Sequence, residues 1–181
     1  MFPQYNEKKT TQIAAYLLQK AGGVMHYLKL LKLLYLLDRA ALKVWREPLT
    51  NDKYYSMRHG PVLSNTYDRI RYRSPIDVDS YWYNCISEPK NYQVKLITPC
   101  SVSELSPAEI QLIDIIYRQF GDWDRWKLRD YCHTLPEYKQ TTSSIPIDLK
   151  EILLAIGKNE DEINQIEIEL KDQAYLDALF G

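Results

Sequence analysis

The sequence has no marked excess of charge of either sign. Its 23 lysines and arginines against 24 aspartates and glutamates give a formal net charge of -1. Sequence-independent binding to DNA or RNA needs a clustered excess of Lys and Arg. Nucleic acid is therefore not expected as the primary partner.

Cysteine and glycine are also scarce. The three cysteines, Cys85, Cys100 and Cys132, form no CxxC pair, so the sequence predicts reduced thiols, with neither a disulfide framework nor a thiolate zinc site. The six glycines make neither GxGxxG nor a Walker-type GxxxxGK motif. These are the loops that bind nucleotide phosphates, and we therefore expect no nucleotide cofactor.

Long uninterrupted apolar runs are absent as well. The most apolar segment, residues 25–45, is interrupted by Lys29, Lys32, Asp38 and Arg39, whereas a membrane span needs about 20 apolar residues. Residues 1–20 do not have the pattern of a secretory signal. We expect no membrane partner. The protein should act in the cytoplasm, either as a resident cytoplasmic protein or as one that a virus or mobile element carries.

The pattern of histidines does not favour an enzyme. His26, His59 and His133 show no HxxxH or HExxH spacing, so we expect no metal and no other cofactor. Cys132 and His133 would point about 100° apart on a helix, which makes them a poor thiolate–imidazolium pair. We predict no catalytic residue, with a hydrolase that uses Cys132 and His133 as the alternative. His133 is expected instead at a helix C-terminus, where a donor complements the last carbonyls.

What the sequence does contain is a large apolar fraction centred on one helix. Hydrophobic residues make up 45% of the 181 residues, enough for one good core. Between residues 25 and 45 the leucines fall on every side of a 3.6-residue period, which is typical of a helix at the centre of a domain. We predict a mainly α, compact single domain with a small β-hairpin or a short two- to three-stranded sheet.

Turn and capping signals place the elements around this central helix. A first helix from residue 6 or 7 should end at Gly22-Gly23 and pair with the central helix as an antiparallel hairpin. Pro61 is expected to open a helix that Pro75 ends, and a strand at residues 92–97 is expected to pair with one at 53–57. Ser106 and Glu109 form a capping box for another helix. The remaining predictions are a short helix from about 124, a polar linker at 141–146, and helices at 147–156 and 160–180.

The chain divides best at residue 140. Residues 1–140 are predicted to form the helical domain, and residues 141–181 a C-terminal helical extension that packs on it or projects from it. The acidic, Ile-rich spacing of residues 160–170 suits a partner helix, a homodimer contact or packing on the core. The oligomeric state stays open.

Charged residues in the central helix allow two interpretations. Lys29 and Lys32 lie on one helix face and could bind an anion or an acidic partner, or they are the solvated edge of a buried helix. Asp38 must be exposed or paired. We expect it to meet a tyrosine or arginine from residues 54–69, which would fix the central helix to the following turn.

Four segments together resemble one family. They are KLLKLLYLLDRAAL (residues 29–42), REPLTNDKYYSMRHGPV (46–62), LSPAEIQLID (105–114) and YCHTLPEYKQ (131–140). Their order is similar to that of the Panacea domain, the SocA-like antitoxin family of bacteria and their phages. The similarity covers roughly residues 7–140, and the part that ends in Gly60-Pro61 is the most specific.

The resemblance implies an antitoxin-like protein that binds and neutralises a toxin encoded beside it, with delivery of this toxin to a host protease as a further role. The alternative is a phage or mobile-element protein that binds a host regulator or protease. Fifteen tyrosines and four tryptophans favour protein recognition. The candidate partner-binding residues are Tyr54, Tyr55, Arg58, His59, Trp123, Trp126 and Tyr138, each with core or rim packing as the alternative. Gly60 and Pro61 are expected to serve the local fold, with an unusual backbone angle at Gly60.

Overall fold

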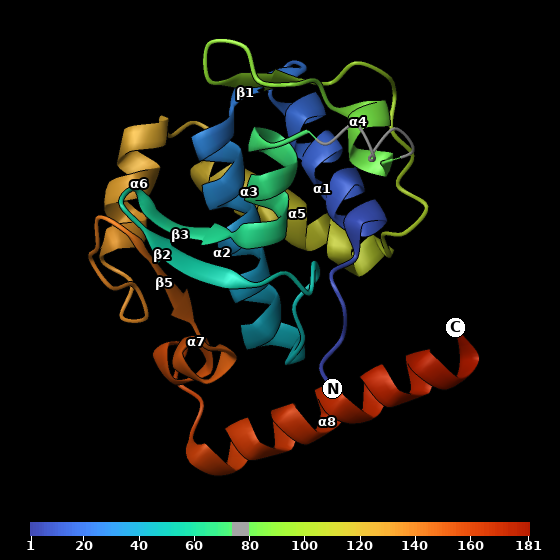
Figure 1. Ribbon diagram of the computed structural model, residues 1–181, viewed down its shortest axis with the longest axis vertical. Helices are drawn as coiled ribbons and strands as arrows, with labels where there is room; N and C mark the ends of the chain where they lie inside the picture. Colours follow the sequence, from blue (N-terminus) through green and yellow to red (C-terminus); the bar gives the residue numbers. More distant parts are fainter. Residues whose placement is uncertain (74–79) are drawn as a thin grey trace.

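One long helix runs through the middle of the structure, and the other elements surround it (Figure 1). The computed structural model describes residues 1–73 and 80–181. Within these ranges the helices are α1 (Glu7–Lys20), α2 (Tyr27–Trp45), α3 (Ser64–Arg71), α4 (Tyr81–Cys85), α5 (Pro107–Phe120), α6 (Arg125–His133), α7 (Leu149–Ala155) and α8 (Glu160–Phe180). The strands are β1 (Val24–His26), β2 (Tyr54–Met57), β3 (Gly60–Leu63), β4 (Gln93–Lys95) and β5 (Ser144–Ile147). The predicted mainly α class with a small sheet is confirmed.

The central position of α2 follows from its composition. All seven leucines between Leu28 and Leu37 are buried, because α1, α5, α6 and β3 pack around the helix. The imidazole of His26 caps the N-terminus, with Nδ1 accepting from the Leu28 amide at 3.1 Å. The helix ends at Trp45, and the C-cap residue Arg46 adopts the left-handed conformation with φ 66°. The predicted buried central helix is confirmed, as is the capping box of Ser106 and Glu109 on α5.

The sheets differ from the predicted pairing. Strand β4 pairs with β1, with Met25 opposite Val94, and not with β2. The reason lies in Gly22 and Gly23, whose φ angles of 83° and 95° turn the chain after α1 into a short strand that the sequence pattern did not indicate. Strand β2 lies in the middle of the other sheet, between β3 and β5, and so has no free edge for β4.

The segment after Gly60 is a strand, so the prediction of a helix that begins at Pro61 is wrong. Gly60 has φ 103°, the conformation that commonly follows the turn of a β-hairpin, and β3 then pairs with β2. Strand β3 is an edge strand, where a proline without an amide proton is tolerated. Helix α3 starts three residues later, at Ser64. Pro75, which was expected to end it, lies outside the described residues.

The polar linker predicted at residues 141–146 is partly wrong, because Ser144–Ile147 form β5 and complete the sheet beside β2. Helix α8 then crosses one end of the structure (Figure 1). Its first half buries Ile163, Ile166 and Leu170, whereas Tyr175 in its second half is 64% exposed. The division of the chain at residue 140 stays a prediction. None of the described helices is long and apolar enough to cross a membrane.

Candidate partner-binding site

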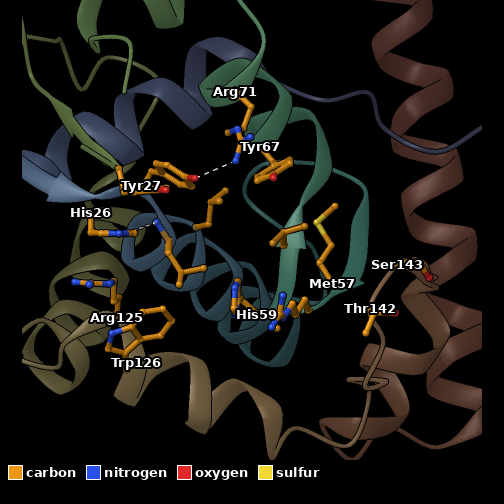
Figure 2. A pocket seen from close by; sticks show the side chains of 16 residues that line it. His26, Tyr27, Met57, His59, Tyr67, Arg71, Arg125, Trp126, Thr142 and Ser143 are labelled. Atoms are coloured by element: carbon orange, nitrogen blue, oxygen red, sulfur yellow. Dashed lines mark hydrogen bonds between the residues drawn. The ribbon is translucent and has the colours of Figure 1, made fainter. Parts of the chain in front are cut away.

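A hollow of about 560 Å³ opens between the start of α2, the β2–β3 turn, α3 and the start of α6. Figure 2 shows its side chains, which come from segments far apart in the sequence. Leu28, Leu31 and Val62 form its apolar base, and all three are buried. The other lining residues are mostly aromatic or basic, and they determine what the hollow can bind.

Arginine supplies the charge of the hollow. Arg58 lies on the β2–β3 turn, Arg71 at the end of α3, and Arg125 at the start of α6. The guanidinium of Arg71 donates from Nη1 to the hydroxyl oxygen of Tyr27 at 3.1 Å, which Figure 2 shows as a dashed line. Its guanidinium carbon lies 5.8 Å from the ring centre of Tyr67. Arg71 is thus held against aromatic rings, with donors left for a ligand.

Trp126 is the largest exposed side chain of the hollow. Its ring is 42% exposed and lies 4.9 Å from the guanidinium of Arg125 and 4.8 Å from that of Arg129. The ring of His59 contacts it edge-on, with centroids 5.9 Å apart. Asp124 fixes the start of α6 by accepting from the amides of Trp126 and Lys127 at 2.8 and 2.9 Å. Capping of α6 therefore determines where Trp126 and Arg125 lie.

A second group of rings lies at the start of α2. His26 stacks on Tyr92, with centroids 5.8 Å apart and an interplanar angle of 6°, and it also contacts Tyr27 at 5.5 Å. Burial and the nearby Arg125 guanidinium lower the pKa of His26. The pKa of His59 is lowered by burial and then by Arg58. Both imidazoles are therefore mainly neutral at pH 7, and the arginines carry the positive charge.

Lys32 lies behind the hollow and does not bind a ligand at its surface, so both sequence-based interpretations of this residue are wrong. The side chain is 0% exposed, because β3 and α6 cover this face of α2. Its Nζ donates to the carbonyl oxygen of Pro61 at 2.6 Å, and burial lowers its pKa to about 7. Lys29 is half-buried and donates from Nζ to the carbonyl oxygen of Gly121 at 2.5 Å.

The residues around Lys32 explain the Gly-Pro motif. A Cβ atom on Gly60 would lie 3.1 Å from both Cε and Nζ of Lys32, and 3.4 Å from Cδ2 of His133. Lys32, Gly60, Pro61 and His133 are thus brought together, and they join the hairpin to α2 and α6. His133 is the last residue of α6, as predicted, and its ring stacks on Tyr138 with centroids 4.5 Å apart.

Asp38 meets a tyrosine, as the sequence predicts. Its Oδ2 accepts from the hydroxyl of Tyr54 at 2.9 Å, and its Oδ1 accepts from the amides of Leu49 and Thr50 at 2.9 and 3.1 Å. The Thr50 hydroxyl donates to the same carboxylate. Burial raises the pKa of Asp38 to about 6, although these hydrogen bonds oppose the shift. Tyr54 is accordingly 7% exposed and faces the interior.

The structure therefore separates the predicted partner-binding residues. Arg58, His59 and Trp126 line one hollow. Tyr55 lines a different one, of about 550 Å³, beside the N-terminal segment and β5. Trp123 is half-buried and packs edge-on against Phe120, with centroids 5.1 Å apart. Tyr138 is also half-buried, and its hydroxyl donates to the carbonyl oxygen of Met57 at 2.9 Å.

Several residues of the hollow are missed by the sequence analysis. They are His26, Tyr27, Tyr67, Arg71, Tyr92 and Arg125. A signal existed for Arg125, since it stands between the helix-capping Asp124 and the candidate Trp126. For Arg71 and Tyr92 no local signal existed, because long-range packing brings them beside α2.

A comparison with protein families identifies one match. The model of the family described as antitoxin SocA-like, Panacea domain, matches residues 30–139. This range covers more than half of the chain and includes the β2–β3 hairpin, α3 and α6. Searches among curated proteins and solved structures found no significant match.

Proposed function

Because this chain belongs to the antitoxin SocA-like Panacea domain family, we propose that it neutralises a cognate toxin by direct protein–protein contact at the hollow beside Trp126. The toxin is expected to be the product of a neighbouring reading frame. Binding removes the toxin from its target, so this function needs neither a cofactor nor a catalytic residue. We place it in the cytoplasm, where such a toxin is made, and include delivery of the toxin to a host protease as a later step.

The exposed ring of Trp126 is the observation that carries this choice of surface. Tryptophan, tyrosine and arginine dominate the residues that contribute most to protein interfaces, and aromatic residues and arginine are enriched in interfaces relative to the rest of the surface. Trp126 is 42% exposed between two arginines, and Tyr92 across the hollow is 66% exposed. Two large rings open to solvent on one face suit a partner surface.

The alternative of a hydrolase has little support from the environment of Cys132. The thiol is 0% exposed, and burial raises its pKa to about 11. A nucleophilic cysteine needs a thiolate that its substrate can reach. In addition, no group of three or more metal-binding side chains occurs in residues 1–73 and 80–181. Our proposal is therefore a binding function.

Coexpression with the product of the neighbouring reading frame tests this function. Growth is measured with and without this protein, and the pair is copurified. We expect growth to be rescued and a stable complex to form, and Trp126→Ala to weaken both. Tyr175→Ala serves as the matched control, because it removes another exposed ring, on α8, without changing the hollow.

Two results would contradict the proposal in different ways. A toxic neighbour that is neither rescued nor bound would remove the antitoxin function, and binding to a host regulator or protease would then be the hypothesis to test. Rescue that is lost in Tyr175→Ala but kept in Trp126→Ala would retain the antitoxin function and move the contact surface to α8.

A further inference from the structure

The charges around the hollow point to one class of ligand. Arg58, Arg71 and Arg125 line it, and its described lining contains neither Asp nor Glu. We propose that the hollow binds an acidic segment of a protein partner, in which a carboxylate stands next to an apolar or aromatic side chain. This inference deepens the function proposed above and rests on it, because it takes the partner to be a protein.

The three arginines come from three separate elements and line one hollow; Figure 2 labels two of them, Arg71 and Arg125. A guanidinium carries several donors in a rigid plane and can form paired hydrogen bonds with a carboxylate. The hydrogen bond from Arg71 to Tyr27 and the contact of Arg125 with Trp126 hold two of these groups in place. A ligand therefore meets donors that are already ordered, which lowers the entropy cost of binding.

In the part of the chain that the structure describes, none of these three arginines forms an ion pair with a carboxylate. Arg125 has an acidic neighbour in Asp124, whose pKa is lowered by its hydrogen bonds from the Lys127 and Trp126 amides and, to a lesser extent, by the charge of Arg125. Among the described residues, Arg39, Arg46, Arg69, Arg73 and Arg129 each form an ion pair with a carboxylate. Within residues 1–73 and 80–181, four arginines form no ion pair with a carboxylate. Three of them line this hollow, and the fourth is Arg118 on α5. The Nε atom of Arg125 is also buried without a hydrogen-bond partner. Such a buried donor is costly when unpaired.

Apolar surface makes a protein segment a better match than a phosphate or a nucleic acid. The exposed rings of Trp126 and Tyr92 line the hollow beside the arginines, where they can pack against an apolar side chain but offer little to an inorganic anion. Nucleic acid needs a longer basic surface, whereas the whole chain has a net charge of -1. Charge complementarity within this short hollow therefore favours acidic side chains of a protein.

The inference can be tested on the full chain with a defined probe. The probe is a blocked peptide of alternating glutamate and leucine, and the control peptide has glutamine in place of glutamate. Binding is followed by NMR through the indole resonance of Trp126 and by calorimetry. We expect the acidic peptide to bind and to shift that resonance, its affinity to fall with added salt, and the glutamine peptide to bind far more weakly.

Variants locate the binding site. Arg58→Gln and Arg125→Gln are each expected to weaken binding of the acidic peptide by about tenfold or more, the usual effect of losing a hydrogen bond to a charged group. Arg118→Gln is the matched control, because this exposed arginine lies outside the hollow, and it should bind the peptide like the unmodified chain. Arg58 lies on an exposed turn, so its replacement tests the inference even if Arg125→Gln fails to fold.

Inorganic phosphate and a short single-stranded DNA are tested in parallel. The inference is overturned if the acidic peptide does not shift the Trp126 resonance, if Arg118→Gln weakens binding as much as the other two changes, or if phosphate or DNA binds the arginines more tightly than the peptide does.

Copurification of the toxin with the same variants separates this inference from the proposed function. If the toxin binds the Arg58→Gln and Arg125→Gln variants as well as the unmodified chain, the antitoxin function stands and the acidic-segment inference fails. If the acidic peptide binds through these arginines while the neighbouring product is neither bound nor neutralised, the hollow is an acidic-peptide site and the proposed antitoxin function fails.

Discussion

The ammonium group of Lys32 donates to the carbonyl oxygen of Pro61 at 2.6 Å, in a position where Lys32 is 0% exposed. This contact joins the central helix to the edge strand β3 just behind the candidate binding site. A buried lysine must be largely neutral or find partners, and among the described residues the hydrogen-bond acceptor of Lys32 is the carbonyl oxygen of Pro61 alone. The arrangement makes the stability of the hairpin depend on the protonation of one side chain.

Stability should therefore rise with pH above neutrality. The pKa of Lys32 is lowered to about 7 in the folded chain, whereas an unfolded lysine titrates near 10.4, so the unfolded state binds more protons between these values. From pH 7 to 9.5 the free energy of unfolding should gain about 3 kcal/mol from this group. Urea unfolding between pH 7 and 9.5 measures how the free energy of unfolding depends on pH. Lys32→Met should remove this dependence, whereas the control Lys43→Met, on the exposed side of α2, should keep it. Equal slopes in all three proteins would refute this assignment.

Gly60→Ala should destabilise the fold through two effects. Its φ of 103° is unfavourable for any residue with a Cβ atom, and that atom would lie 3.1 Å from Nζ of Lys32. Strain of this kind costs about 1–3 kcal/mol. Gly157→Ala is the control, since Gly157 has φ 92° and nothing within 4 Å of the added atom, so it carries the backbone effect alone. Thermal unfolding should show a larger loss for Gly60→Ala, and similar losses would mean that the contact with Lys32 is unimportant.

Asp38→Ala should cost stability without a selective effect on binding. The change leaves the amides of Leu49 and Thr50 and the hydroxyl of Tyr54 without their acceptor, and each buried orphan donor costs about 1–3 kcal/mol. Tyr54→Phe should cost less than Asp38→Ala, about 1.5–3 kcal/mol, because a single hydrogen bond to the carboxylate is lost. Chemical denaturation measures both, with exposed Asp172→Ala as the control. A loss of toxin binding in folded Asp38→Ala would contradict this purely structural role.

Oxidation should join Cys85 to Cys100. Their Sγ atoms lie 3.0 Å apart, and both are free thiols. With hydrogen peroxide, the two thiols lose two protons and two electrons to form one S–S bond, and the peroxide is reduced to two waters. Burial and the neighbouring thiol raise the pKa of Cys100 to about 12, so the reaction should be slow at pH 7.

Mass spectrometry of a proteolytic digest measures this reaction, and Cys132→Ser should leave it unchanged because Cys132 is buried elsewhere in the core. Cys85→Ser should abolish the crosslink. A crosslink that includes Cys132, or none after prolonged oxidation, would contradict the prediction.

Local physical chemistry made some features predictable from the sequence. The leucines of α2 cover every side of a helical period, so this helix had to be central, and the Ser106–Glu109 capping box satisfies its own amides within one turn. The pairing of Asp38 with a tyrosine was also predictable, because a carboxylate in so apolar a helix must find donors close by. The helix and its cap depend on neighbours within about one turn, and the Asp38 pairing depends on the few nearby residues that can donate a hydrogen bond to a buried carboxylate.

Other features were decided by tertiary structure. Strand β4 pairs with β1 and β5 takes the free edge of β2, because strand pairing depends on which edges the packed helices leave open. The helical pattern alone is compatible with a solvated Lys32, but β3 and α6 bury its side chain in the folded chain. The hollow is lined in part by Arg58, Arg71 and Arg125, which stand up to 67 positions apart in the chain. The sequence by itself determined the central helix and its caps, whereas only the folded chain could place these three charges around one apolar surface.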